Sequence, residues 1–184
     1  LDAMDQIIRL DFRPAVYGGL PRTIQVEKLA AGETDLYVLD GLSGGIIRAI
    51  LTANGSIIDE NFVCGPGTYS SIDRSTEVSR NESFTLEALI DMQLLPRVNP
   101  FGSASLIAMD SSGSLLFCNP TTDTYAWKLQ DPDIRWKDPL AFSMSGSLST
   151  IYILDPSGNA VWTYDLDSSN LFNDAPELFF SGDY

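Results

Sequence analysis

Three stretches of the chain share one alternation of hydrophobic and polar positions. In residues 150–165, TIYILDPSGNAVWTYD, two alternating apolar runs flank a turn rich in proline, glycine and asparagine. Residues 35–51 (DLYVLDGLSGGIIRAIL) and 105–120 (SLIAMDSSGSLLFCNP) repeat the arrangement. In each copy the first run ends in an aspartate that precedes a turn containing Ser-Gly: Asp40, Asp110 or Asp155. Alternation with a period of two around turn residues predicts three β-hairpins.

Further apolar runs flank the three hairpins and extend each of them. The runs at 23–29, 88–95 and 140–145 precede a hairpin, and those at 56–62, 124–129 and 178–181 follow one. The run at 88–95 is compatible with a helix or a strand, and its place before a hairpin favours the strand. Four short antiparallel strands joined by tight turns form the unit of a propeller blade.

The pattern therefore predicts an all-β chain, a partial β-propeller of about three four-stranded antiparallel blades. The hairpin aspartates are 70 and then 45 residues apart, and the second spacing fits one blade. We expect blades over 23–62, 84–130 and 138–184, with a polar loop insertion over 63–83. Residues 1–20 contain an apolar run at 8–12, which predicts one strand belonging to an adjoining blade.

Three blades do not close a ring, because propellers typically have about four to eight. The missing blades would come from a longer polypeptide, which we favour, or from a partner copy in a homodimer.

Composition narrows the class of protein. The chain has 184 residues, 44% of them hydrophobic, and a net charge of −14, which together describe a folded acidic protein rather than a disordered one. Only eleven lysines and arginines are present, so a nucleic acid or an anionic membrane is not expected as a partner. No apolar run approaches the roughly 20 residues of a membrane-spanning helix, and no targeting signal indicates the compartment.

The residue types present offer little catalytic chemistry. Histidine is absent, which excludes Ser-His-Asp and Cys-His nucleophiles and histidine-based zinc sites. The turns that follow Asp110 and Asp155 lack the distal glutamate of a calcium loop, so each aspartate is expected to accept backbone N–H groups within its turn. We predict no catalytic residue, no cofactor and no metal ligand.

A few residues are candidates for structural or binding roles. Cys64 and Cys118 would form a disulfide in an oxidising compartment or remain two buried thiols. Aromatic residues of the second half of the chain would form a ligand platform or, more commonly, fill the space between blades. The candidates for an interaction surface are Trp136 and Arg135, which lie in a charged loop, and Tyr69.

The repeated stretches YVLDGLSGGIIRAIL and YILDPSGNAVWTYD resemble bacterial β-propellers of the NHL and quinoprotein-like type. Three further stretches are similar to propeller regions of some bacterial proteins, in which the propeller follows a phosphatase-like domain and a membrane anchor. These stretches are LDAMDQIIRLDF, NFVCGPGTY and the last hairpin. The resemblance implies a non-catalytic sensing or binding module with an extracytoplasmic or cell-surface location.

The sequence thus favours a binding or scaffold module that contacts another protein. Two alternatives stay open at this point. One is a hydrolase or lyase that uses carboxylates at the propeller funnel, and the other is a structural subunit of a cell-surface assembly.

Overall fold

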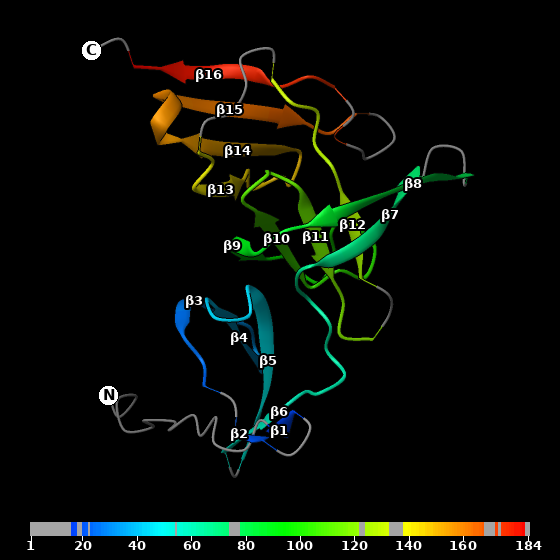
Figure 1. The fold of residues 1–184 in the computed structure, drawn as a ribbon, viewed down its shortest axis with the longest axis vertical. Helices are drawn as coiled ribbons and strands as arrows, with labels where there is room; N and C mark the ends of the chain where they lie inside the picture. Colours follow the sequence, from blue (N-terminus) through cyan, green and yellow to red (C-terminus); the bar gives the residue numbers. More distant parts are fainter. Residues whose placement is uncertain are drawn as a thin grey trace.

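Each predicted hairpin forms the centre of a four-stranded antiparallel sheet in the computed structural model (Figure 1). The first sheet contains β3 (Val26–Ala31), β4 (Asp35–Asp40), β5 (Gly45–Thr52) and β6 (Gly55–Ile58). The second contains β9 (Leu89–Leu94), β10 (Leu106–Asp110), β11 (Leu115–Cys118) and β12 (Tyr125–Trp127). The third contains β13 (Ala141–Met144), β14 (Thr150–Asp155), β15 (Ala160–Asp165) and β16 (Glu177–Ser181). Within each sheet the strands follow chain order, so each is a simple meander.

The structure describes residues 16–17, 20–21, 23–53, 55–73, 78–121, 124–132, 138–167, 172 and 174–182. The strand predicted at 8–12 lies outside these ranges. Two residue pairs, β1 (Val16–Tyr17) and β2 (Leu20–Pro21), form a short separate hairpin. No helix in the described part of the chain is long and apolar enough to cross a membrane.

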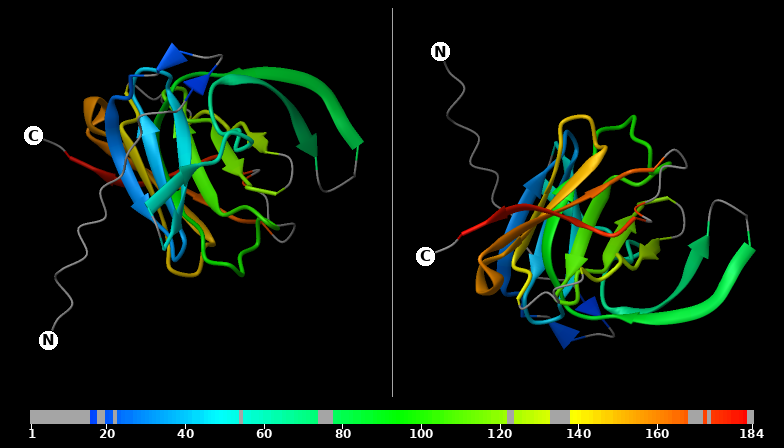
Figure 2. Two further views of the ribbon diagram at one scale, coloured as in Figure 1. Left: turned by 90° about the horizontal axis from the view of Figure 1, so that it is seen from below. Right: turned by 90° about the horizontal axis from the view of Figure 1, so that it is seen from above.

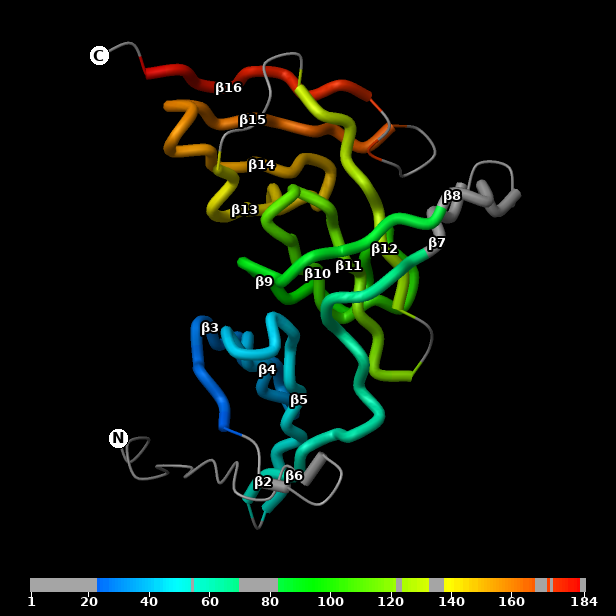
Figure 3. The backbone as a smooth tube through the Cα atoms, viewed as in Figure 1, coloured from blue at the N-terminus to red at the C-terminus, as the bar shows by residue number. Residues whose placement is uncertain are grey.

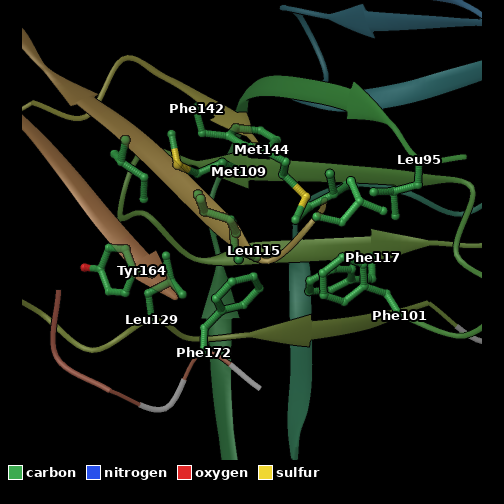
Figure 4. Packing of buried hydrophobic residues seen from close by; sticks show 14 of the residues in the cluster. Leu95, Phe101, Met109, Leu115, Phe117, Leu129, Phe142, Met144, Tyr164 and Phe172 are labelled. Atoms are coloured by element: carbon green, nitrogen blue, oxygen red, sulfur yellow. The ribbon is translucent and has the colours of Figure 1, made fainter. Parts of the chain in front are cut away.

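The second sheet is buried on both faces, because alternate residues of its strands enter two different hydrophobic clusters. On β10, Leu106 and Ala108 pack with residues of the first sheet, whereas Ile107 and Met109 pack with residues of the third. Figure 4 shows the cluster between the second and third sheets, where Met109 lies with Phe142 and Met144. The facing sides of the first and third sheets are buried only because the second sheet packs against them. The sheets therefore stabilise one another, as successive blades of a propeller do.

The first strands of the three sheets lie next to one another: β3 contacts β9, and β9 contacts β13. The chain passes from sheet to sheet in order, as the backbone trace shows (Figure 3). Face-to-face stacking of consecutive four-stranded sheets with adjacent first strands is the arrangement of a propeller. The chain is therefore an all-β partial propeller of three blades, as predicted.

Each of the three repeated aspartates connects, through hydrogen bonds, the turn of its hairpin with the residues before the first strand of the same sheet. All three are buried. A backbone N–H from just before the first strand donates to each of them, at 2.9, 2.9 and 3.1 Å; the donors are Gln25, Glu87 and Asp138 in chain order. Each carboxylate also accepts an N–H from its own turn, for example that of Gly158 on Asp155 at 3.0 Å. The prediction that Asp110 and Asp155 accept N–H groups within their turns is confirmed, and Asp40 accepts the N–H of Leu42 in the same way.

Glycine is required at one of these turns because two sheets approach closely there. Gly44 has a φ of 65°, and a Cβ on it would lie 2.9 Å from the backbone of Ala88, just before β9. Its carbonyl accepts the N–H of Leu89 at 2.8 Å. This contact helps to set the distance between the first and second sheets, and a side chain would force them apart.

The segment predicted as a loop insertion contains a hairpin instead. β7 (Gly67–Asp73) pairs with β8 (Val78–Leu86), and the hairpin projects away from the stacked sheets (Figure 2). Its base is held by apolar residues: Leu86 is buried, and Tyr69 and Phe84 pack against the cluster between the first two sheets. The loop prediction was wrong because the polar composition hid a strand pair whose apolar residues are few and lie far apart in the sequence.

Candidate interaction surface

Each sheet has two faces. In the first and second sheets, one face packs against the next sheet in chain order. We call this face, and the equivalent face of the third sheet, the leading face. Residues three and one positions before the repeated aspartate belong to it in every sheet. They are Tyr37 and Leu39 in the first sheet, Ile107 and Met109 in the second, and Tyr152 and Leu154 in the third. All six are apolar or aromatic, so the three leading faces are of the same chemical kind.

The leading faces differ in what covers them. In the first sheet Tyr37 and Leu39 are 2% and 1% exposed, and Ile107 and Met109 of the second are fully buried. Leu154, at the corresponding position of the third sheet, is 41% exposed. The third leading face is therefore an apolar sheet face left uncovered among the described residues.

The outer strand β16 enlarges this uncovered face. Phe180 pairs with Val161, and a register shift between Val161 and Trp162 leaves Phe179 between two paired positions. The side chains of Phe179 and Phe180 are 67% and 58% exposed. The ring of Phe179 packs edge-on against Tyr152 at 5.4 Å between centroids. Large apolar side chains gathered on one exposed face mark an interaction site more reliably than single exposed residues do.

Among the described residues, the charged side chains lie at the margin of this face. The register places Ala141, Ser143, Val161 and Thr163 beside Tyr152 and Leu154, and all of them are uncharged. Asp165 and Glu177 stand at the end where β15 meets β16. On a chain with a net charge of −14, an uncharged apolar area is unusual and favours contact with another apolar surface.

The first strands show how one sheet receives the next. On β9, the carboxylate of Asp91 accepts the N–H of Phe142 at 2.9 Å, and the amide oxygen of Gln93 accepts the N–H of Met144 at 3.0 Å. The ammonium group of Lys28, on β3, pairs with the same Asp91. Side chains of one first strand therefore satisfy backbone donors of the following first strand. The positions on β13 that correspond to Asp91 and Gln93 are Ala141 and Ser143.

The two cysteines form a disulfide in the structure. Cys64 lies after the first sheet and Cys118 ends β11 of the second, and their Cα atoms are 5.7 Å apart. Both residues are buried. The bond therefore links the segment that follows the first sheet covalently to the second sheet.

The three residues proposed for interaction have different outcomes. Tyr69 is half-buried, and its hydroxyl donates to the carbonyl of Gly65 at 2.7 Å, so it supports the base of the β7–β8 hairpin. Burial raises the pKa of its phenol. Arg135 and Trp136 lie outside the described residues.

Four other aromatic residues of the second half lie between the second and third blades. Trp162 and Tyr164 belong to the cluster between the second and third sheets, and Tyr125 and Trp127 pack against it. The hydroxyl of Tyr164 donates to the carbonyl of Gln130 at 2.7 Å. These four side chains therefore pack between blades, as expected for most aromatic residues of the second half.

The partly buried Arg48 forms ion pairs that stabilise the first sheet. Arg48 pairs with Asp35 at 3.0 Å and Asp59 at 2.7 Å. Burial lowers the pKa of Arg48, but the hydrogen bonds to Asp59 and Asp35 outweigh this effect and raise the pKa overall. Within the described ranges no three His, Cys, Asp or Glu side chains gather in a way that would hold a metal ion.

The chain matches no protein-family model and no curated protein. Its candidate surface therefore rests on geometry. The leading face was not singled out from the sequence, although the signal was present: apolar residues three and one positions before each aspartate recur in all three copies. What the sequence could not show was that, among the described residues, two of the three leading faces are covered and the third is exposed.

Proposed function

We propose that the chain is a non-catalytic β-propeller module that binds another protein through the leading face of its third sheet and so acts as a scaffold or sensing unit. The observation that carries the proposal is the uncovered face around Leu154, whose counterparts at Leu39 and Met109 are buried in sheet-to-sheet interfaces. A face built like two covered interfaces is suited to forming a third.

Two further features support this proposal. Four carboxylates are buried and accept backbone N–H groups: those of Asp40, Asp91, Asp110 and Asp155. A carboxylate-dependent hydrolase needs carboxylates that can reach the substrate, whereas these four hold the fold together. The disulfide fits an oxidising compartment. Both agree with the resemblance to propeller modules of NHL and quinoprotein-like type and with an extracytoplasmic location.

The test compares partner retention by matched variants. The tagged chain, expressed in its source organism and cross-linked, is purified alongside Leu154→Arg and Leu42→Arg. Leu42 is 59% exposed in the turn after β4 and serves as a control for adding a charge at an exposed leucine. We expect one protein to be retained in near-stoichiometric amount by the wild type and Leu42→Arg, and to be lost with Leu154→Arg. Equal retention by all three, or none by the wild type, would refute the proposal.

A further inference from the structure

The chemistry of the protein partner can be specified further, on the assumption that the leading face of the third sheet is the binding site proposed above. We propose that the partner binds with a segment that carries apolar side chains at one end and lysine or arginine side chains at the other. The apolar end covers Leu154 and Phe180, and the cationic end pairs with Asp165 and Glu177. The argument rests on the order of the side chains across this face.

The leading face of the third sheet changes from apolar to acidic along its strands. The register arranges its side chains in three successive rows. The first row is Ala141, Leu154, Val161 and Phe180; the second is Ser143, Tyr152, Thr163 and Glu177; the third includes Thr150 and Asp165. Residues two apart on a strand are about 7 Å apart, so the first and third rows are separated by about 13 Å. A partner that matches all three rows is therefore apolar at one end and polar at the other.

The second sheet shows that an acidic end is not a general feature of these faces. Tyr125 holds the position in the second sheet that Glu177 holds in the third, because the register aligns them with Ile107 and Tyr152. The ring of Tyr125 stacks on Phe117 at 4.8 Å between centroids and packs against the cluster between the second and third sheets. A carboxylate covered in the same way without a partner would be costly to bury. A partner that covers Glu177 therefore has to bring a group that pairs with its carboxylate.

The chain itself does not neutralise the two acids. The sequence from Asp138 to Tyr184 contains no lysine or arginine. Asp165 and Glu177 are exposed, and neither forms an ion pair with a described residue. The hydroxyl of Thr150 donates to Asp165 at 2.5 Å, which leaves the negative charge in place. Because the whole chain has a net charge of −14, cationic groups are attracted to this end and can form charge-assisted hydrogen bonds there.

The partner covers the face of the sheet rather than adding a strand at its edge. β16 is the outermost strand, and its pairing with β15 is interrupted by the register shift between Val161 and Trp162. An irregularity of this kind at a sheet edge twists the backbone and hinders the pairing of a further strand. The contact is therefore made by side chains, and Leu154, Phe179 and Phe180 are exposed to receive it.

The probe is a short fluorescent peptide with leucine residues at one end and lysine residues at the other. A second probe has glutamate in place of every lysine, so the two share the apolar end and differ in charge. Binding to the full chain is measured by fluorescence anisotropy. The variants are Leu154→Ser, Asp165→Asn, Glu177→Lys and the control Glu60→Lys. Glu60 is an exposed acid just after β6, so the control makes the same change in net charge on the first sheet (Figure 1).

We expect the lysine probe to bind the wild type at least about tenfold more tightly than the glutamate probe. Glu177→Lys should weaken its binding at least about threefold, and Glu60→Lys less than about twofold. Asp165→Asn, which keeps an oxygen for the Thr150 hydroxyl, should weaken binding about twofold. Leu154→Ser should weaken it at least about fivefold through the loss of apolar contact. Added NaCl should reduce the effect of Glu177→Lys, because salt screens exposed charges. An unchanged circular dichroism spectrum confirms that each variant is folded.

Three results would overturn the proposal. The first is equal affinity for the two probes, and the second is the absence of binding by the lysine probe. The third is equal weakening by Glu177→Lys and Glu60→Lys, which would reduce the effect to net charge. If retention of the cellular partner depends on Leu154 but not on Glu177, the proposed function stands and the cationic segment is refuted. Retention that does not depend on Leu154 refutes the proposed function itself.

Discussion

Asp110 offers the sharpest test of how the repeated aspartates hold the fold. Its buried carboxylate accepts three backbone N–H groups: that of Glu87 at 2.9 Å, of Ser112 at 2.9 Å and of Ser114 at 2.8 Å. It also accepts the hydroxyl of Ser112 at 2.7 Å. Asp110→Ala removes the carboxylate that accepts all four hydrogen bonds and leaves the four donors in place. The loss in the free energy of unfolding then depends on whether each donor can bind water instead.

The donors differ in their access to water. Ser114 is buried, so its N–H would remain without a partner at a cost of about 1–3 kcal/mol. Glu87 and Ser112 are exposed residues, and their N–H groups can turn to water at about 0.5–1.5 kcal/mol each. The sum is about 4 kcal/mol, a large share of the roughly 5–15 kcal/mol that stabilises an ordinary domain. Urea unfolding followed by tryptophan fluorescence measures the loss.

Two variants act as controls for this prediction. Asp110→Asn keeps one acceptor oxygen and should lose about half as much stability as Asp110→Ala. Ser112→Ala removes only the hydroxyl donor and should lose less than about 1 kcal/mol. A loss below about 1 kcal/mol for Asp110→Ala would refute the capping role. Stabilisation of the wild type by excess CaCl₂, absent from Asp110→Ala, would instead show that the turn binds a cation.

The remaining predictions concern the contacts between blades. Because the disulfide closes a loop with a separation of 54 residues, the Cys64→Ser, Cys118→Ser double variant should lose about 4 kcal/mol in urea unfolding, and a reductant should not destabilise it further. Asp91→Ala should cost about 1–3 kcal/mol in urea unfolding because the buried N–H of Phe142 loses its acceptor. Lys28→Met should cost less than about 1 kcal/mol, because the Lys28 side chain is partly exposed, and equal losses would contradict this difference. Because burial raises the pKa of Tyr69, its contribution to stability is complete below about pH 10 and is lost as the pH rises through the folded-state pKa. Tyr69→Phe should lessen the alkaline fall of the melting temperature, and an unchanged pH profile would refute this assignment.

The local strand pattern was readable from the sequence because each hairpin carries its own signals. Apolar alternation around 150–165, the turn residues that follow Asp155 and the recurrence at Asp40 and Asp110 together predict three meanders and their approximate bounds. The turn role of the aspartates also followed from short-range chemistry, since their donors within the turn lie two to four residues away.

Contacts between distant segments were decided only by the tertiary structure. The hairpin at 67–86 exists because Tyr69, Phe84 and Leu86 reach a cluster formed by other sheets. The disulfide forms because stacking brings Cys64 beside Cys118. The 41% exposure of Leu154 likewise depends on how the sheets pack, because the equivalent Leu39 and Met109 are buried. The alternation of apolar residues in the sequence shows that a sheet face is apolar. Whether that face is buried depends on a second surface that packs against it, so burial is known only from the tertiary structure.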